Sequence, residues 1–124
     1  MTLACVRFTE PAFHNWQGAP KGKEYLGQRH RHLFHVEVCL EVLHDDREVE
    51  FHDLLSFSRA SFPGKVIQGI RDAALGYGPV REMGGLSCEM MARAVRTAVV
   101  GKWTGRTCIV SVYEDGEVGA EVSE

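Results

Sequence analysis

Apolar and polar residues alternate along four stretches of the chain, a pattern typical of strands that bury one face. We predict strands over Leu3 to Thr9, Arg29 to Leu43, Arg106 to Tyr113 and Val118 to Val122. The Asp115-Gly116 pair between the last two strands is a strong hairpin signal. A short returning strand is expected from Glu48 to Phe51, after the turn at Asp45-Asp46.

The hydrophobic period changes after His52 to one that favours helices. A first, short helix should stop before Pro63-Gly64, because proline disfavours helix both at its own position and at the residue before it. A second helix is expected to end at residues 76–79, which contain two glycines and a proline. The apolar face of the first is Leu54, Leu55, Phe57, Ala60 and Phe62, and that of the second is Val66, Ile67, Ile70, Ala73 and Ala74.

The third predicted helix has the clearest boundaries. Ser87 suits its N-cap, Glu89 suits the positive end of the helix dipole, and Gly101 closes the segment. Its buried face is predicted to be Met91, Ala94, Val95, Ala98 and Val99.

These elements predict one α+β domain spanning residues 1–124, with a four-stranded antiparallel sheet and helices on one face in the order β-β-α-α-β-β. A chain of 124 residues can form one hydrophobic core but not two. Four strands leave two long sheet edges, which favours a homo-oligomer that pairs or covers them.

Composition and charge narrow the classes of partner. A net charge of −3 provides no basic surface for gripping phosphates, so we expect no direct nucleic acid binding. No apolar run approaches the ~20 residues that cross a bilayer, and Met1 to Cys5 does not resemble a signal peptide. The four cysteines form no C-x-x-C pair, and buried free thiols in a reducing cytoplasm are favoured over a disulfide framework.

Histidines provide the first candidate site. His30 and His32 are spaced i, i+2, so on a strand both rings point to one face, with Cα atoms roughly 7 Å apart. His14 lies where the long connection from Glu10 to Gly27 begins, and antiparallel pairing of the first two strands would bring it near the other two. Three histidines with an open fourth position are typical of catalytic zinc. The alternative is that all three are surface or capping residues.

Two further candidates are polar positions at the ends of elements. Glu114 ends an apolar strand, where its carboxylate can accept two hydrogen bonds from the amino-pyrimidinone edge of guanine or a pterin; it can equally be a solvated strand-end charge. Ser87, Cys88 and Glu89 begin a helix, where free backbone N–H groups can hold a polar ligand, or they form an ordinary helix cap.

Taken in order, several short motifs resemble the tunnelling-fold (T-fold) family, which includes the 6-pyruvoyl and 6-carboxy tetrahydropterin synthases (QueD). The family pattern is A-A-H, H-G-H-N-Y, D-F-x-x-L, P-T-x-E and a late strand ending in glutamate. The corresponding segments here are residues 12–14 (AFH), 30–34 (HRHLF), 50–54 (EFHDL), 86–89 (LSCE) and 110–114 (VSVYE). The resemblance spans nearly the whole chain, although each motif matches only in part.

This resemblance implies a function for each candidate residue. His14, His30 and His32 would hold zinc, and Glu114 would anchor the ligand's amino-pyrimidinone edge with help from Ser87, Cys88 and Glu89. The family's subunits join their sheets into an oligomeric barrel, with active sites at the subunit interfaces.

The departures from the family pattern concern proton transfer. The family's catalytic cysteine, four residues before the first histidine of H-G-H, corresponds to Leu26. The family's L-D-H-x-x-L-N segment is nearest to residues 70–75, where Asp72 is kept and no histidine is present. Arg31 replaces the glycine of H-G-H. Positioned proton-transfer groups typically supply ~10²–10⁴-fold in rate, so the usual synthase reaction is not the one we expect.

The sequence therefore predicts a zinc-dependent, QueD-like lyase acting on a pterin or 7-deazaguanine ligand in the cytoplasm, the host cytoplasm if the protein is viral. Decarboxylation of 7-carboxy-7-deazaguanine for viral DNA modification would need an anchored heterocycle, a nearby cation and a proton source, but no cysteine. The alternatives are a 6-carboxy or 6-pyruvoyl tetrahydropterin synthase with a different base, and a non-catalytic binding module.

Overall fold

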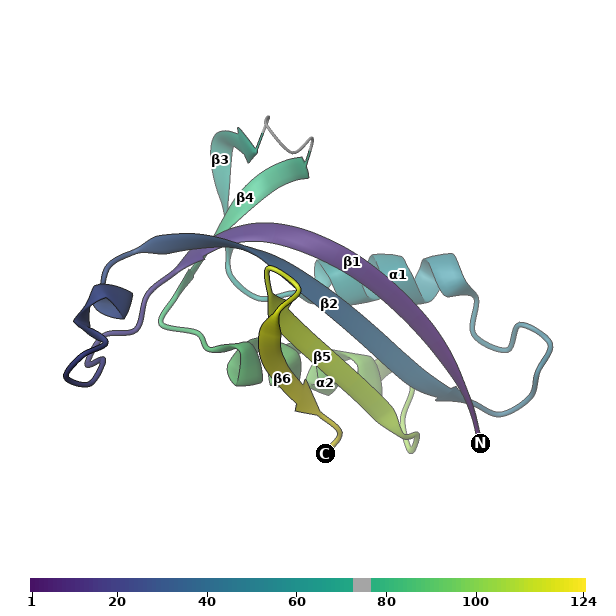
Figure 1. The fold of residues 1–124 in the computed structure, drawn as a ribbon. Coiled ribbons are helices and arrows are strands. Elements are labelled where there is room, and N and C mark those ends of the chain that lie inside the picture. The colour runs from purple at the N-terminus through teal and green to yellow at the C-terminus, as the bar shows by residue number, and fades with distance from the viewer. Residues whose placement is uncertain (73–76) are drawn as a thin grey trace.

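Two long strands, β1 (Thr2–His14) and β2 (His30–Val42), arch across the molecule in the computed structural model, which describes residues 1–72 and 77–124 (Figure 1). They pair antiparallel without a break, from Thr2 opposite Val42 to His14 opposite His30. The strand prediction is confirmed for both, although β1 is longer than expected. This register sets one histidine of each strand side by side where the pairing ends.

The two C-terminal strands extend the sheet as the alternation predicted. β5 (Cys108–Glu114) pairs antiparallel with β2, and β6 (Val118–Val122) pairs antiparallel with β5. Asp115 and Gly116 form the turn between them, with φ of 53° and 75°. Positive φ at two successive turn residues is the geometry of the type I′ turn, which suits the twist of hairpin strands.

The second predicted helix, starting near Val66, is wrong. This segment forms β3 (Lys65–Asp72), which is antiparallel to β4 (Tyr77–Gly84). Val66, Ile67 and Ile70 are β-branched and surround Gly69, a composition that favours a strand over a helix. Ala73 and Ala74 of that prediction lie outside the described residues.

The β3–β4 hairpin also changes the sheet as a whole. β4 runs parallel to the end of β1, with Ala12 opposite Arg81 and Phe13 opposite Glu82. The sheet is therefore six-stranded and mixed, in the order β3-β4-β1-β2-β5-β6, rather than four-stranded and antiparallel. The expected order β-β-α-α-β-β lacked this hairpin, which lies between the two helices. The α+β class is confirmed.

Two α-helices are present among the described residues. α1 (Phe51–Ala60) begins after Glu50, whose side chain accepts a hydrogen bond from the Asp53 backbone N–H, so the strand expected from Glu48 to Phe51 is wrong. α2 (Cys88–Lys102) begins after Ser87, whose hydroxyl accepts from the Met90 N–H as predicted. A short 3₁₀-helix, η1 (Glu24–Gly27), lies in the connection between β1 and β2.

One hydrophobic core lies between the sheet and both helices. Alternate residues of the strands meet Leu54 of α1 and Met91, Val95 and Val99 of α2, all fully buried. The predicted face of α2 is confirmed except that Ala94 is exposed, Ala98 is half-buried and Ala92 is buried in their place. The largest fully buried strand side chains include Phe34, Val36, Val38, Leu40, Val110 and Val112.

A disulfide joins Cys5 and Cys39 across β1 and β2. The two residues are opposite each other in the register, and their Cα atoms are 4.1 Å apart. The expectation of free thiols is therefore wrong for this pair, because antiparallel pairing brings together cysteines that lie 34 residues apart in the chain. Cys88 and Cys108 are free and buried, as expected.

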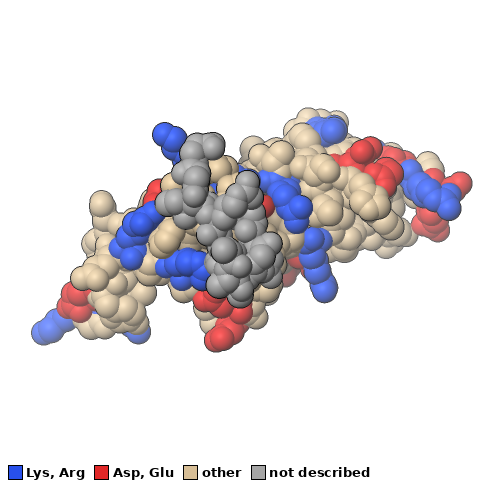
Figure 2. Space-filling view, turned by 90° about the horizontal axis from the view of Figure 1, so that it is seen from above, with Lys and Arg blue, Asp and Glu red and all other residues tan. Residues whose placement is uncertain are grey.

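Charged side chains of both signs are interspersed on the face seen from above, where the β3–β4 hairpin lies (Figure 2). Neither helix within residues 1–72 and 77–124 is long and apolar enough to cross a bilayer.

Candidate metal centre

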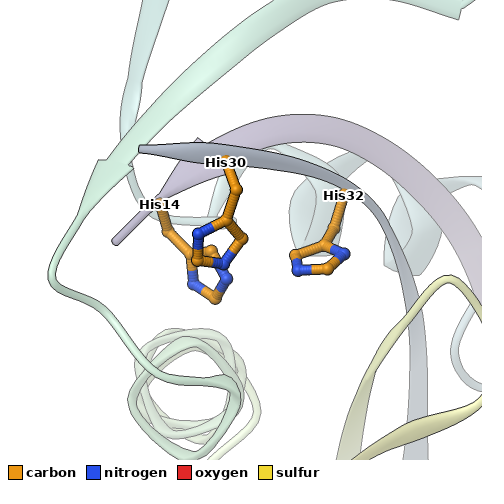
Figure 3. A group of neighbouring side chains, drawn as sticks. All are labelled: His14, His30 and His32. Carbon is orange, nitrogen blue, oxygen red and sulfur yellow. The ribbon is translucent and has the colours of Figure 1, made fainter. Parts of the chain in front are cut away.

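Three histidine rings meet on one side of the sheet where β1 ends and β2 begins (Figure 3). His14 comes from β1, and His30 and His32 come from alternate positions of β2. One ring nitrogen of each lies within 4.8 Å of those of the other two, a separation that allows the group to hold a metal ion. The predicted convergence of the three residues is confirmed.

The Nδ1 atom of each histidine faces an oxygen. His14 Nδ1 is 3.1 Å from the Leu86 carbonyl, His30 Nδ1 is 2.8 Å from the Gln28 carbonyl, and His32 Nδ1 is 2.7 Å from the Asp115 carboxylate. Carbonyl and carboxylate oxygens only accept, so these contacts favour a hydrogen on each Nδ1, the tautomer that keeps a lone pair on Nε2. Metal-binding histidines are oriented in this way.

His14 is the most buried of the three, with 8% of its surface exposed. Its Nε2 is buried and has no hydrogen-bond partner among the described residues. Burial lowers the pKa of His14, and the neighbouring His30 lowers it further, against the opposing hydrogen bond with Leu86. A buried, neutral imidazole with an unpartnered lone pair fits a cation ligand, since metal binding requires deprotonated histidine.

Glu114 lies beside the same nitrogens. Its Oε1 is 3.4 Å from His14 Nε2, and its Oε2 is 3.5 Å from His32 Nε2. Bonds of about 2.0–2.1 Å in a tetrahedral site separate ligand atoms by about 3.4 Å, so this carboxylate borders the space a metal would fill. A carboxylate facing two nitrogen lone pairs is repelled by them unless a cation or proton lies between.

The candidate residues at the start of α2, which are Ser87, Cys88 and Glu89, line the same site as His14, His30 and Glu114. Cys88 Sγ is 4.0 Å from Glu114 Oε1, and burial, together with the charges of Glu114 and Glu89, raises the pKa of the thiol to about 12. Cys88 is therefore a neutral thiol next to a carboxylate and not an activated nucleophile. Ser87 uses its hydroxyl as the helix cap, which is the ordinary structural role.

A cleft of about 700 Å³ opens over the centre. Leu26 contributes to its wall, and the exposed side chains of Trp16, Met90 and Val118 contribute apolar surface. The remaining lining residues are His14, Asn15, Gln17, His30, Gly85, Leu86, Ser87, Cys88, Glu89, Glu114 and Gly119.

Asp115 is a residue at this centre that the sequence patterns did not single out as functional. The turn signal identified its conformation, but not the contact of its carboxylate with His32, which is 83 residues away. No protein-family model matches the chain, and no curated protein matches it at a significant level.

Proposed function

We propose that the protein is a zinc-dependent lyase that acts on a pterin-like or 7-deazaguanine ligand. The observation that carries this proposal is the convergence of three oriented histidines, with Glu114 beside them, at a cleft large enough for a small molecule. A set of three imidazoles with room for a further ligand suits zinc and is typical of its catalytic sites.

The walls of the cleft suit a flat heterocycle with polar edges. Trp16 and Leu26 offer apolar surface, while the two oxygens of Glu114 can accept a pair of N–H groups from an amino-pyrimidinone ring. The neutral Cys88 thiol can donate to Glu114 and thereby help to hold the carboxylate in place.

The reaction that best fits this set of residues is decarboxylation, as of 7-carboxy-7-deazaguanine. The bond between the ring and its carboxylate breaks, carbon dioxide leaves, and the ring carbon takes a proton. Bound zinc would supply a positive charge close to the charge that develops. The chain's own contribution is to orient the ring through Glu114 and to exclude water with the apolar wall.

We further propose that the protein acts as a homo-oligomer with sites near subunit interfaces. The sheet ends in the unpaired edges of β3 and β6, and Val118 of β6 is exposed and lines the cleft. A neighbouring subunit placed along β6 would then cover apolar surface next to the metal centre.

The experiment that tests the proposal is direct incubation of the zinc-loaded protein with two substrates in separate reactions. Loss of carbon dioxide from 7-carboxy-7-deazaguanine, detected as the product mass, is the expected result. Turnover of dihydroneopterin triphosphate instead would identify a tetrahydropterin synthase and refute the decarboxylase. Binding of either compound without turnover would indicate a non-catalytic module, and Glu114→Gln is the matched variant for ligand binding.

A further inference from the structure

Of the three histidines, only His32 has a side-chain acceptor at Nδ1 among the described residues. Its partner is Asp115 Oδ2, at 2.7 Å, whereas the other two rings are held by backbone carbonyls. The second carboxylate oxygen, Oδ1, accepts from the Leu33 backbone N–H at 2.9 Å. One carboxylate thus binds two successive residues of β2 and uses both of its oxygens.

The backbone of Asp115 explains how the side chain reaches β2. The β2–β5 ladder ends with Phe34 opposite Glu114, and the Asp115 N–H donates to the Leu33 carbonyl at 2.7 Å. At Asp115 the chain turns with a φ of 53°, a left-handed conformation that few side chains adopt without cost. The carboxylate then supplies the acceptor for the Leu33 N–H.

We propose that Asp115 is a positioning residue of the metal centre: its carboxylate fixes His32 in the Nδ1–H tautomer and aims the Nε2 lone pair at the metal. This inference rests on the metal centre of the proposed function but not on the substrate or the reaction. Substituting outer-shell partners of this kind typically weakens metal binding 10–100-fold.

If Asp115 only formed the turn, Asp115→Asn would leave the tautomer of His32 and the zinc affinity unchanged. Asparagine tolerates the left-handed conformation at least as well as aspartate, so the turn is kept. Its side chain has one acceptor oxygen for the two donors, Leu33 N–H and His32 Nδ1–H. If the oxygen stays on Leu33, the amide N–H₂ faces His32 and favours the tautomer whose lone pair is on Nδ1.

The first measurement is nitrogen-15 NMR of the metal-free protein at pH 8, which reports the tautomer of each imidazole directly. We expect His32 as Nδ1–H in the native protein and loss of that preference in Asp115→Asn, with His14 and His30 unchanged. Asp46→Asn, in an exposed turn where the aspartate pairs with Arg47, is the matched control and should change none of the three.

The second measurement is the zinc Kd by competition with a chelator, in which Asp115→Asn should bind 10–100-fold more weakly than the native protein and Asp46→Asn should not differ from it. Asp115→Gly, which also keeps the turn, should match the asparagine variant. A native His32 in the Nε2–H form overturns the proposal, as does an Asp115→Asn variant with native zinc affinity. Failure of the native protein to bind zinc would remove the metal centre from the proposed function, while failure to turn over either substrate would leave this result unaffected.

Discussion

Zinc should raise the melting temperature of the native protein and should not raise that of a His30→Ala, His32→Ala double variant. These two residues supply two of the three nitrogens that lie within 4.8 Å of one another. Both are only partly buried, so truncating them removes ligands without emptying the core, whereas His14, at 8% exposure, would confound the test with a packing defect.

The expected shift follows from linkage between binding and folding. A ligand present at 100 times its Kd stabilises the folded state by about 2.7 kcal/mol. For a domain of this size, 1 kcal/mol corresponds to roughly 3–6 °C, so the native protein should gain about 8–16 °C. Structural zinc sites with four protein ligands bind the ion with roughly 10–16 kcal/mol, which is roughly 2.5–4 kcal/mol per ligand. At that value, each imidazole lost from this set of three histidines weakens binding about 100-fold or more, which leaves the double variant with a shift near zero.

The assay is thermal unfolding followed by circular dichroism with and without zinc, together with metal analysis of dialysed protein. The matched control is His35→Ala, because His35 lies on the same strand but at a position of opposite parity, facing away from the triad. It should keep the full zinc shift. The ligand assignment would be refuted if zinc raised the melting temperature of the double variant as much as that of the native protein, or if the double variant retained one metal ion per chain.

Three other predictions concern single residues or pairs. Glu114→Gln should weaken binding of guanine-like ligands roughly 5–150-fold in equilibrium dialysis, because one N–H donor loses its acceptor; unchanged binding would remove Glu114 from the ligand site. The denatured, unreduced protein should titrate two thiols out of four cysteines, and four would contradict the Cys5–Cys39 disulfide. Because burial lowers the pKa of His14, the unfolded chain binds a proton more readily, so stability of the metal-free protein is fully present above about pH 6.5 and falls as the pH drops below it. Urea unfolding at pH 8 and pH 5.5 should show a smaller loss for His14→Gln than for the native chain, and equal losses would contradict this assignment.

The strands that the sequence predicted correctly are those whose pattern is sufficient by itself. Apolar residues recur at every second position through most of β2 and β5, a pattern that fits a strand with one buried face. The segment after Val66 has no such alternation, and its apolar residues fit a helical face as well as a strand. Pairing of β4 with the free edge of β1 decides between the two structures, and that contact is not encoded locally.

The Cys5–Cys39 disulfide was not predicted for a related reason. Neither residue belongs to a short motif, and β1 and β2 place them opposite each other only because the register runs unbroken from one end of the pair to the other. Prediction of that register from sequence would have required the turn geometry of a long, irregular connection.

In the candidate metal centre, too, local spacing predicted some features, while others depend on contacts between residues far apart in the sequence. The i, i+2 spacing of His30 and His32 is a property of any strand, so their convergence was predictable, and antiparallel pairing added His14. What orients the rings was not predictable. His14 depends on the carbonyl of Leu86, which is 72 residues away, and a backbone carbonyl leaves no signature in the sequence. His32 depends on Asp115, whose place in a hairpin turn already accounts for its residue type. Since a lone pair binds metal only when it points at the metal, a chain with the same three histidines and a different β5–β6 turn would lack one of the contacts that orient the proposed ligands. We therefore expect the turn after Glu114 to tune the metal affinity of the proposed site, with a smaller effect than the loss of a histidine ligand.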